Sequence, residues 1–141
     1  MPSIRFFNEG LRFSVPHPRK TTSWIKDAIK REKRTLDELN FIFCSDEYLR
    51  SINLDYLKHD FYTDIITFDN SEEKLRIAGD IFISIDRVKE NAVELAIPFE
   101  TELHRVIIHG VLHLVGYSDK SRNKKTLMRK KEDAYLSLRL K

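Results

Sequence analysis

The stretch VIIHGVLHLVG, residues 106–116, decides the fold because it is the part of the chain that most needs to be buried. No charged residue lies between Arg105 and Asp119, and a helix without a polar face packs inside a domain. Pro98 suits the first turn of such a helix, and Gly116 suits its end. We therefore expect a buried helix that begins near Pro98 and runs to Gly116.

Two histidines share one face of this expected helix. His109 and His113 are four residues apart, so their imidazoles lie about one turn apart on the same side. After Gly116 the chain turns, and Asp119 can reach back toward them in the pattern H-x3-H-x5-D. Two histidines and a carboxylate, with a fourth position vacant, are ligands typical of catalytic zinc, which activates water for hydrolysis. The alternative is a pair of core histidines that form hydrogen bonds with other polar groups.

Gly110 excludes one class of metalloenzyme. In the H-E-x-x-H metalloproteases a glutamate follows the first histidine and serves as the general base, whereas here glycine follows His109. A glycine in the middle of a helix costs up to ~1 kcal/mol relative to alanine. It suggests that another backbone packs closely there, although the helix could also simply tolerate it.

Other titratable residues near this motif carry weaker signals. Glu102 precedes His109 by two helical turns, so it could orient a ligand or act as an acid or base. The simpler interpretation is a charged residue in a first helical turn, stabilised by the helix dipole. His104 lies off the face of His109 and is not expected to be a ligand. His17 and His59 lie in loop-like segments and carry no signal alone.

The remaining segments predict an α+β fold: a single domain over residues 1–141, with a small mixed sheet of about four strands and about five helices. The metal site would lie on the fourth helix and the turn after it. The expected strands are ELNFIFCS (38–45), TDIITFD (63–69) and LRIAGDIFISI (75–85), the last two joined as a hairpin. The other expected helices run from a cap at Thr22 or Ser23 to about Arg34, from Ser45 or Asp46 to about Leu57, from Asp86 to Leu95, and from about Asn123 to Leu140.

Composition and charge are those of an ordinary globular protein with an uneven charge distribution. Hydrophobic residues make up 41% and charged residues 33% of the 141 residues. No apolar run approaches the ~18 residues that span a membrane. Residues 119–141 hold nine Lys or Arg against three acids, which suggests an anionic partner such as nucleic acid, or merely a solvated helix face. The lone Cys44 and the absence of a basic-then-apolar leader favour the cytoplasm.

Several stretches together resemble the YbeY family of endoribonucleases. HGVLHLVGY, residues 109–117, resembles the signature of that family. N-x-x-Y from Asn53 to Tyr56, TDIITF from Thr63, and GDIFIS from Gly79 are similar to further family segments in the same order. Met128 and Glu132 resemble the M-x-x-x-E of its last helix. The similarity covers nearly the whole chain.

This resemblance implies an activity, a cofactor and partners. It implies a single-strand-selective endoribonuclease that matures the 3′ end of small-subunit (16S) ribosomal RNA and acts in ribosome quality control. It also implies one zinc ion, or another divalent transition metal, held by the three motif positions 109, 113 and 119. The partners would be single-stranded or ribosomal RNA and the small ribosomal subunit with its associated factors, with no membrane or DNA involved.

Two departures from the family pattern concern its chemistry. The family usually has histidine as its third ligand, where this sequence has Asp119, a competent zinc ligand. A carboxylate lowers the net charge of the site by one unit relative to a neutral histidine, so the ion would be a weaker Lewis acid. The family also usually has a basic residue directly after the tyrosine of N-x-x-Y. Here Leu57 stands there and Lys58 follows, which offers a point charge instead of a bidentate grip.

The leading hypothesis is therefore metal-assisted hydrolysis of RNA, with His109 and His113 acting through the ion and Glu102 a further catalytic candidate. The expected RNA-binding cations are Lys58, Lys124, Lys125, Arg129, Lys130 and Lys131. Tyr56, Phe61 or Tyr62 could stack on an unpaired base. One alternative is a non-catalytic ribosome-binding or RNA-binding assembly factor with a structural or vestigial metal. Another is a metal hydrolase with a different substrate.

Overall fold

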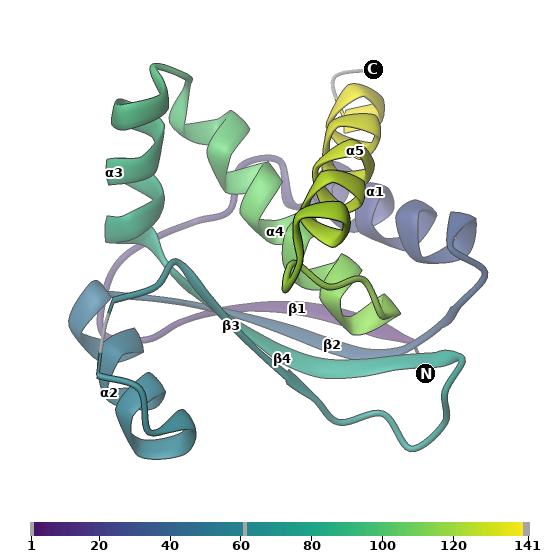
Figure 1. The fold of residues 1–141 in the computed structure, drawn as a ribbon, viewed down its shortest axis with the longest axis horizontal. Coiled ribbons are helices and arrows are strands. Elements are labelled where there is room, and N and C mark those ends of the chain that lie inside the picture. Colours follow the sequence, from purple (N-terminus) through teal and green to yellow (C-terminus); the bar gives the residue numbers. More distant parts are fainter. Residues whose placement is uncertain (1, 61, 140–141) are drawn as a thin grey trace.

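The computed structural model describes residues 2–60 and 62–139, which fold around one four-stranded sheet (Figure 1). In spatial order the strands are β1 (Ser3–Asn8), β2 (Thr35–Cys44), β4 (Arg76–Ser84) and β3 (Ile65–Asp69). β1 and β4 both pair with β2 in parallel, and β3 pairs with β4 antiparallel. The mixed sheet and the hairpin are thus confirmed, while β1 is a strand that the sequence pattern did not place.

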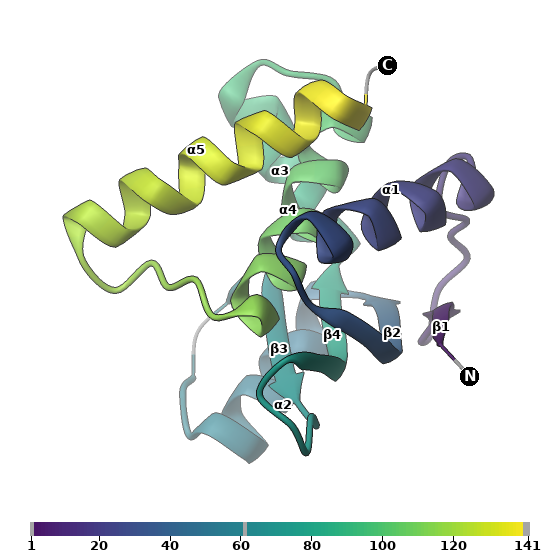
Figure 2. The ribbon, with the colours of Figure 1, turned by 90° about the vertical axis from the view of Figure 1, so that its right-hand side faces the viewer.

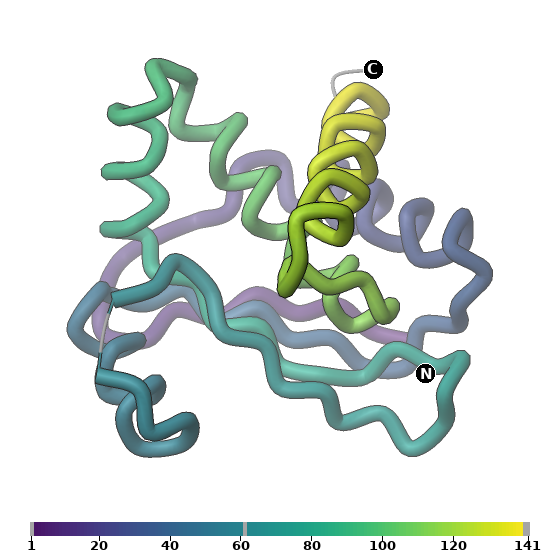
Figure 3. Tube along the Cα trace, viewed as in Figure 1, coloured from purple at the N-terminus to yellow at the C-terminus, as the bar shows by residue number. Residues whose placement is uncertain are grey.

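Five helices surround this sheet. They are α1 (Pro18–Arg31), α2 (Asp46–Leu57), α3 (Ile85–Leu95), α4 (Phe99–Val115) and α5 (Arg122–Arg139). α1 and α4 pack on one face of the sheet, with α3 and α5 on either side of α4 (Figure 1). In the turned view α5 lies across α4 and α1, on the side away from the sheet (Figure 2). The trace shows α3, α4 and α5 following one another along the chain (Figure 3).

α4 is the central helix, as its apolar sequence predicted. Most of its side chains between positions 102 and 115 are buried, among them Leu103, Ile107, Ile108 and Leu112, each fully enclosed. It packs on strands whose side chains alternate between the two faces of the sheet. Burying that many aliphatic side chains stabilises the fold by about 1.5–3 kcal/mol per side chain, which holds α4 and its polar residues in place.

α2 covers part of the opposite face. Leu49 and Ile52 pack there on Ile66 and Cys44 in a second, smaller cluster. The Cys44 thiol is fully buried, and burial raises its pKa to about 12. A thiol so protonated is a packing residue without nucleophilic reactivity.

Most helix boundaries fall near their expected positions, with one clear correction. α1 begins at Pro18, directly after His17, and not after a cap at Thr22 or Ser23. Proline suits the first helical position because its missing N–H needs no partner there. α1 also ends at Arg31, before the expected Arg34. Leu140, the expected end of the last helix, lies outside the described residues.

Side-chain caps mark the starts of α2 and α3. Ser45 Oγ accepts from the Tyr48 amide at 3.1 Å, which confirms the cap expected there. Ser84 Oγ accepts from the Arg87 amide at 3.1 Å, so α3 begins one residue before the expected Asp86.

Gly110 lies where α4 approaches the sheet, and its expected neighbour needs correction. A Cβ atom at this position would lie 2.8 Å from Ile65 Cδ1 and 3.0 Å from Ile81 Cγ2. The close neighbours are therefore isoleucine side chains of β3 and β4, and not another backbone. Glycine lets α4 pack directly on the sheet, because even a methyl group would overpack this contact.

Among residues 2–60 and 62–139, no helix combines the length and the apolar character that crossing a bilayer would require.

Candidate metal centre

Three side chains converge at the end of α4 in the way that their spacing predicted. Asp119 Oδ2 lies 3.7 Å from His109 Nε2 and 3.8 Å from His113 Nε2. One ligand atom from each residue lies within 4.8 Å of the others. Gly116 ends the helix with φ 123°, a conformation that favours glycine. This turn allows the chain to fold back and carry Asp119 to the histidines.

The spacing and chemistry of these atoms fit a divalent transition metal. The ligand atoms of a tetrahedral zinc ion lie roughly 3.3–3.6 Å apart, because each is about 2.0–2.2 Å from the ion. The two separations between Asp119 and the histidines, 3.7 and 3.8 Å, need only small shifts to reach that range. Each of the three side chains is partly exposed, between 21% and 44%, so a fourth position would face solvent. The structure thus has a potential metal site with an open side.

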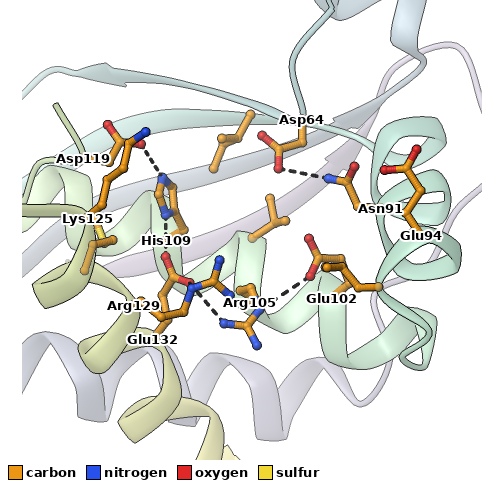
Figure 4. A pocket seen from close by; sticks show the side chains of 14 residues that line it. Asp64, Asn91, Glu94, Glu102, Arg105, His109, Asp119, Lys125, Arg129 and Glu132 are labelled. Carbon is orange, nitrogen blue, oxygen red and sulfur yellow. Dashed lines mark hydrogen bonds and ion pairs between the residues drawn. The ribbon is translucent and has the colours of Figure 1, made fainter. Parts of the chain in front are cut away.

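A fourth residue orients the first histidine. Glu132 of α5, only 3% exposed, has Oε2 2.6 Å from His109 Nδ1. This contact occupies Nδ1 and leaves Nε2 facing Asp119, as Figure 4 shows. Carboxylates commonly hold metal-binding histidines in this way and fix their tautomer. The spacing around the motif gave no sign of this contact, and only the family resemblance of the last helix singled out Glu132.

The pKa values of the two imidazoles are shifted in opposite directions. Burial alone would lower the pKa of His109, but the carboxylates of Glu132, Asp119 and Asp64 together outweigh burial and the pKa is raised. Burial and the neighbouring His109 lower the pKa of His113. His113 is therefore held as neutral imidazole, which is the form that binds a metal.

Glu102 lies two turns before His109 and does not touch it. Its side chain is 4% exposed, and Oε1 lies 3.5 Å from Nε of Arg105. Burial raises its pKa, which the Arg105 charge opposes. Glu102 does lie in the first turn of α4, as the helix-dipole interpretation expects, but it is buried beside a cavity.

That cavity runs from the metal site along α4. It has a volume of about 460 Å³ and lies between β3, α3, α4 and α5. His109 and Asp119 line one end, and Asp64, Asn91 and Glu102 lie toward the other, as Figure 4 shows. We call this cavity the α4 cleft. It is large enough to hold a small organic group beside the metal site.

The α5 cations among the expected RNA contacts differ in their exposure and in their distance from the α4 cleft. Lys125 and Arg129 are exposed and line the α4 cleft, while Lys124 and Lys130 are exposed outside it. Lys131 instead points inward and binds Glu32 Oε2 at 3.0 Å. Its charge is thus engaged within the fold, and it is the one α5 cation among the expected RNA contacts that is only partly exposed.

The turn that carries Asp119 is anchored by the residue after Gly116. Tyr117 donates from its hydroxyl to Glu32 Oε1 at 2.6 Å, and Tyr135 of α5 donates to the other oxygen of the same carboxylate. The pKa of Glu32 is lowered, because these hydroxyl groups and Lys131 together outweigh its burial. One carboxylate directly after α1, with its side chain only 8% exposed, therefore connects the turn to α5.

His104 is separate from the metal site, as its spacing predicted. It is 7% exposed and its ring lies edge-on to Trp24 at 5.7 Å. Burial and the charge of Arg139 lower its pKa to about 4. The folded protein therefore holds this histidine neutral.

We expect His104 to make stability depend on pH between 6.5 and 4. An unfolded histidine takes up a proton near pH 6.5, whereas the folded one does so only near pH 4. The unfolded state thus binds more protons in this window, and the free energy of unfolding falls by up to about 3 kcal/mol as the pH falls. Urea unfolding across this range should show a shallower pH dependence for His104→Leu. Parallel curves for the two proteins would contradict the expectation.

Comparison with known proteins agrees with these features. The family model described as Endoribonuclease YbeY matches residues 9–139. A Cytophaga hutchinsonii protein named Endoribonuclease YbeY is 55% identical over 137 residues, which cover 97% of this chain and 96% of that protein. An Amoebophilus asiaticus protein of the same name is 48% identical over 134 residues, covering 95% and 91%.

A solved structure shares the fold. The solution structure of TM1509 from Thermotoga maritima is 29% identical, with a TM-score of 0.67, over 96% of this chain and 87% of that one. The resemblance inferred from the motifs is therefore confirmed across sequence and structure. This chain belongs to the YbeY family of endoribonucleases.

Proposed function

We propose that this protein is a metal-dependent endoribonuclease that cleaves single-stranded RNA. The observation that carries the proposal is the convergence of His109, His113 and Asp119 at the mouth of a cleft bordered by exposed cations. We further propose that its substrate is ribosomal RNA, in maturation of the 3′ end of the small-subunit RNA and in ribosome quality control. The family to which the chain belongs supports this assignment.

The three convergent residues would hold one zinc ion, with Glu132 keeping His109 in the metal-binding tautomer. A zinc ion so held would polarise a phosphodiester oxygen and make a bound water more acidic. His113 contributes a neutral imidazole. Asp119 contributes a negative charge that an all-histidine site lacks, which favours retention of the cation over strong Lewis acidity.

The cations beside the cleft would hold the RNA backbone. Lys125 and Arg129 border the cleft itself, and Lys124 and Lys130 extend the positive surface along α5. Lys58, exposed at the end of α2 and outside the cleft, would supply a further charge. Such contacts are independent of sequence and weaken with added salt.

One aromatic residue near Lys58 suits stacking on an unpaired base. Tyr56 is 71% exposed and meets Phe68 only edge-on. Tyr62 is less suited, because the guanidinium groups of Arg50 and Arg87 lie over its ring at 5.5 and 5.4 Å. Phe61 lies outside the described residues. Tyr56 is therefore the aromatic residue that we assign to single-strand binding.

We propose that Glu102 acts beside the bound RNA rather than at the reacting phosphate. Seven residues of helix separate it from His109, which corresponds to about 10.5 Å along the axis. This is beyond the hydrogen-bond reach that direct proton transfer to a metal-bound phosphate requires. Glu102 therefore contributes to the α4 cleft.

The proposal is tested by incubating purified protein with a single-stranded RNA and with the same RNA in a duplex. We expect zinc-dependent cleavage of the single strand, loss of cleavage with a chelator, and recovery when zinc is restored. Cleavage that persists after complete metal removal would contradict the metal mechanism. RNA binding without cleavage, unchanged by chelation, would favour the non-catalytic assembly factor instead.

The cellular setting follows from the substrate. We propose a cytoplasmic location and association with the small ribosomal subunit and its factors, without membrane or DNA partners. Co-sedimentation with small subunits from a lysate is the direct measurement, and sedimentation only as free protein would contradict it.

A further inference from the structure

We propose that the end of the α4 cleft away from the metal site is a nucleobase subsite that prefers guanine, with the Glu102 carboxylate accepting hydrogen bonds from the base. The inference rests on the proposed RNA cleavage, because it names the nucleotide that the same cleft would select. It assigns this end of the cleft a role in choosing where the RNA is cut.

The walls of the cleft suit a flat, largely apolar ring. Ile65, Leu95, Val106 and Met128 line it alongside its polar residues. Enzymes that take a base out of a nucleic-acid stack hold it between aromatic or apolar side chains and read its edge with hydrogen bonds. The cleft therefore offers the apolar walls and the hydrogen-bonding groups that such a base-binding site requires.

The polar groups at this end are mainly hydrogen-bond acceptors. Glu102 is 4% exposed, and within the described part of the chain its Oε1 has no hydrogen-bond partner. Asp64 accepts a long contact of 3.4 Å from Asn91 Nδ2, which leaves the Asn91 carbonyl as a further acceptor. The nearest cation, Arg105, is already shared among Glu102, Glu132 and Asp133. Glu102 thus has one ion pair with Arg105, at 3.5 Å, and no hydrogen bond to Oε1, so its carboxylate can accept N–H groups from a ligand in the cleft.

This chemistry disfavours a phosphate at the far end of the cleft. Asp64 and Glu102 both border it, and two carboxylates repel an anion in a place shielded from water. The RNA phosphates would stay at the mouth, near the ligand residues and the exposed Lys125 and Arg129. The far end is then left for the uncharged part of a nucleotide.

The spacing of Glu102 and His109 along α4 matches the reach of a nucleotide. Glu102 lies about 10.5 Å along α4 from His109. Within one nucleotide, the phosphate and the far edge of the base lie at opposite ends, a comparable distance apart. A nucleotide whose phosphate sits at His109 can therefore extend its base toward Glu102. Such a pose requires an unpaired base, which agrees with selectivity for single strands.

Guanine matches an acceptor-rich site better than the other bases. Its Watson–Crick edge carries two adjacent donors, the N1–H and the 2-amino group, which a carboxylate accepts together. Uracil presents one N–H between two carbonyl oxygens, and those oxygens would face the carboxylates. Hydrogen bonds to a charged partner are among the stronger ones in proteins, so the choice of base should be measurable.

The test uses zinc-loaded full-length protein and five uridine-rich single strands that differ at one central nucleotide: guanosine, inosine, adenosine, cytidine or uridine. We expect cleavage beside guanosine to be about tenfold to a hundredfold faster than beside uridine. Inosine, which lacks the 2-amino group, should lose most of that advantage. In a second measurement, guanosine and uridine are each titrated into metal-free protein, and the NMR signal of the Asn91 side-chain amide is followed.

Two variants test the role of Glu102. Glu102→Gln replaces an acceptor oxygen by a donor, and we expect the preference for guanosine to fall to within about twofold. Asp133→Asn is the matched control, because Asp133 also pairs with Arg105, at 3.2 Å, but is exposed outside the cleft. It should keep the preference. If Glu102→Gln does not fold, the titration of the metal-free wild-type protein with guanosine and uridine tests the subsite instead.

The outcomes separate this inference from the proposed function. Equal cleavage beside all five nucleotides, with no response of Asn91 to guanosine, overturns the subsite and leaves RNA cleavage standing. An unchanged preference in folded Glu102→Gln overturns the assignment to Glu102. If no RNA is cleaved at all, the proposed function fails, and the guanosine titration alone decides whether the cleft binds a base.

Discussion

Replacing His113 by alanine is expected to remove stoichiometric zinc and to lower RNA cleavage at least about a thousandfold. The variant leaves only one imidazole and one carboxylate for an ion that needs at least three protein ligands at a catalytic site. A bound metal contributes several kcal/mol of transition-state stabilisation, and every 1.36 kcal/mol is a factor of ten in rate. Metal analysis of the purified protein and single-strand cleavage assays measure both effects.

The fold should survive this change. The His113 side chain is 30% exposed near the end of α4, and alanine favours helix. Thermal unfolding of the metal-free proteins should therefore nearly coincide. A suitable control is His17→Asn, which removes an exposed imidazole outside the cluster and keeps a residue that tolerates the left-handed backbone at this position. Full zinc content and full cleavage in the His113 variant would refute the proposed site.

Replacing Asp119 by alanine is expected to weaken zinc binding at least about a hundredfold. Loss of residues that merely contact a ligand already costs about 10- to 100-fold in metal affinity, and Asp119 is placed as a ligand itself, with Oδ2 facing both histidines. Titration of the metal-free protein with zinc, with a competing chelator, gives the affinity. Ser118→Ala, one residue earlier in the same turn, should bind zinc as the wild type does.

A second substitution at this position tests the consequence of the carboxylate. Asp119→His supplies a neutral ligand and raises the net charge of the site by one unit. We expect it to retain zinc and to cleave RNA faster than the wild type, because the ion becomes a stronger Lewis acid. If Asp119→Ala keeps stoichiometric zinc with unchanged affinity, Asp119 is not a ligand and the ion is held by other groups.

Much of the architecture was predictable because it depends on local patterns. The apolar run at 106–116 could only be a buried helix, and the alternation in residues 75–85 identified a strand that is buried on one face. The hairpin between β3 and β4 followed from a short polar connection. β1 was missed because its six residues, SIRFFN, form an edge strand with few buried positions and without clear turn signals.

The helix start at Pro18 shows how two local signals compete. Thr22 and Ser23 are good capping residues, and their position before an apolar stripe suggested a helix start. The structure instead begins α1 at Pro18, where proline fixes the backbone angle that a first turn needs. Thr21 is then enclosed within the helix and buried. Capping preference alone could not decide between a helix that begins at Pro18 and one that begins after Thr22 or Ser23.

The sequence by itself identified the three candidate ligands, because one helical turn and one glycine turn are enough to let them approach one another. His109, His113 and Asp119 lie within eleven residues, and helix geometry brings them together wherever this segment is placed. Only the tertiary structure decided what surrounds them. Glu132 reaches His109 because α5 lies across α4, and the α4 cleft exists because β3, α3 and α5 enclose one side of that helix. Such contacts depend on how distant segments pack, which no local spacing encodes.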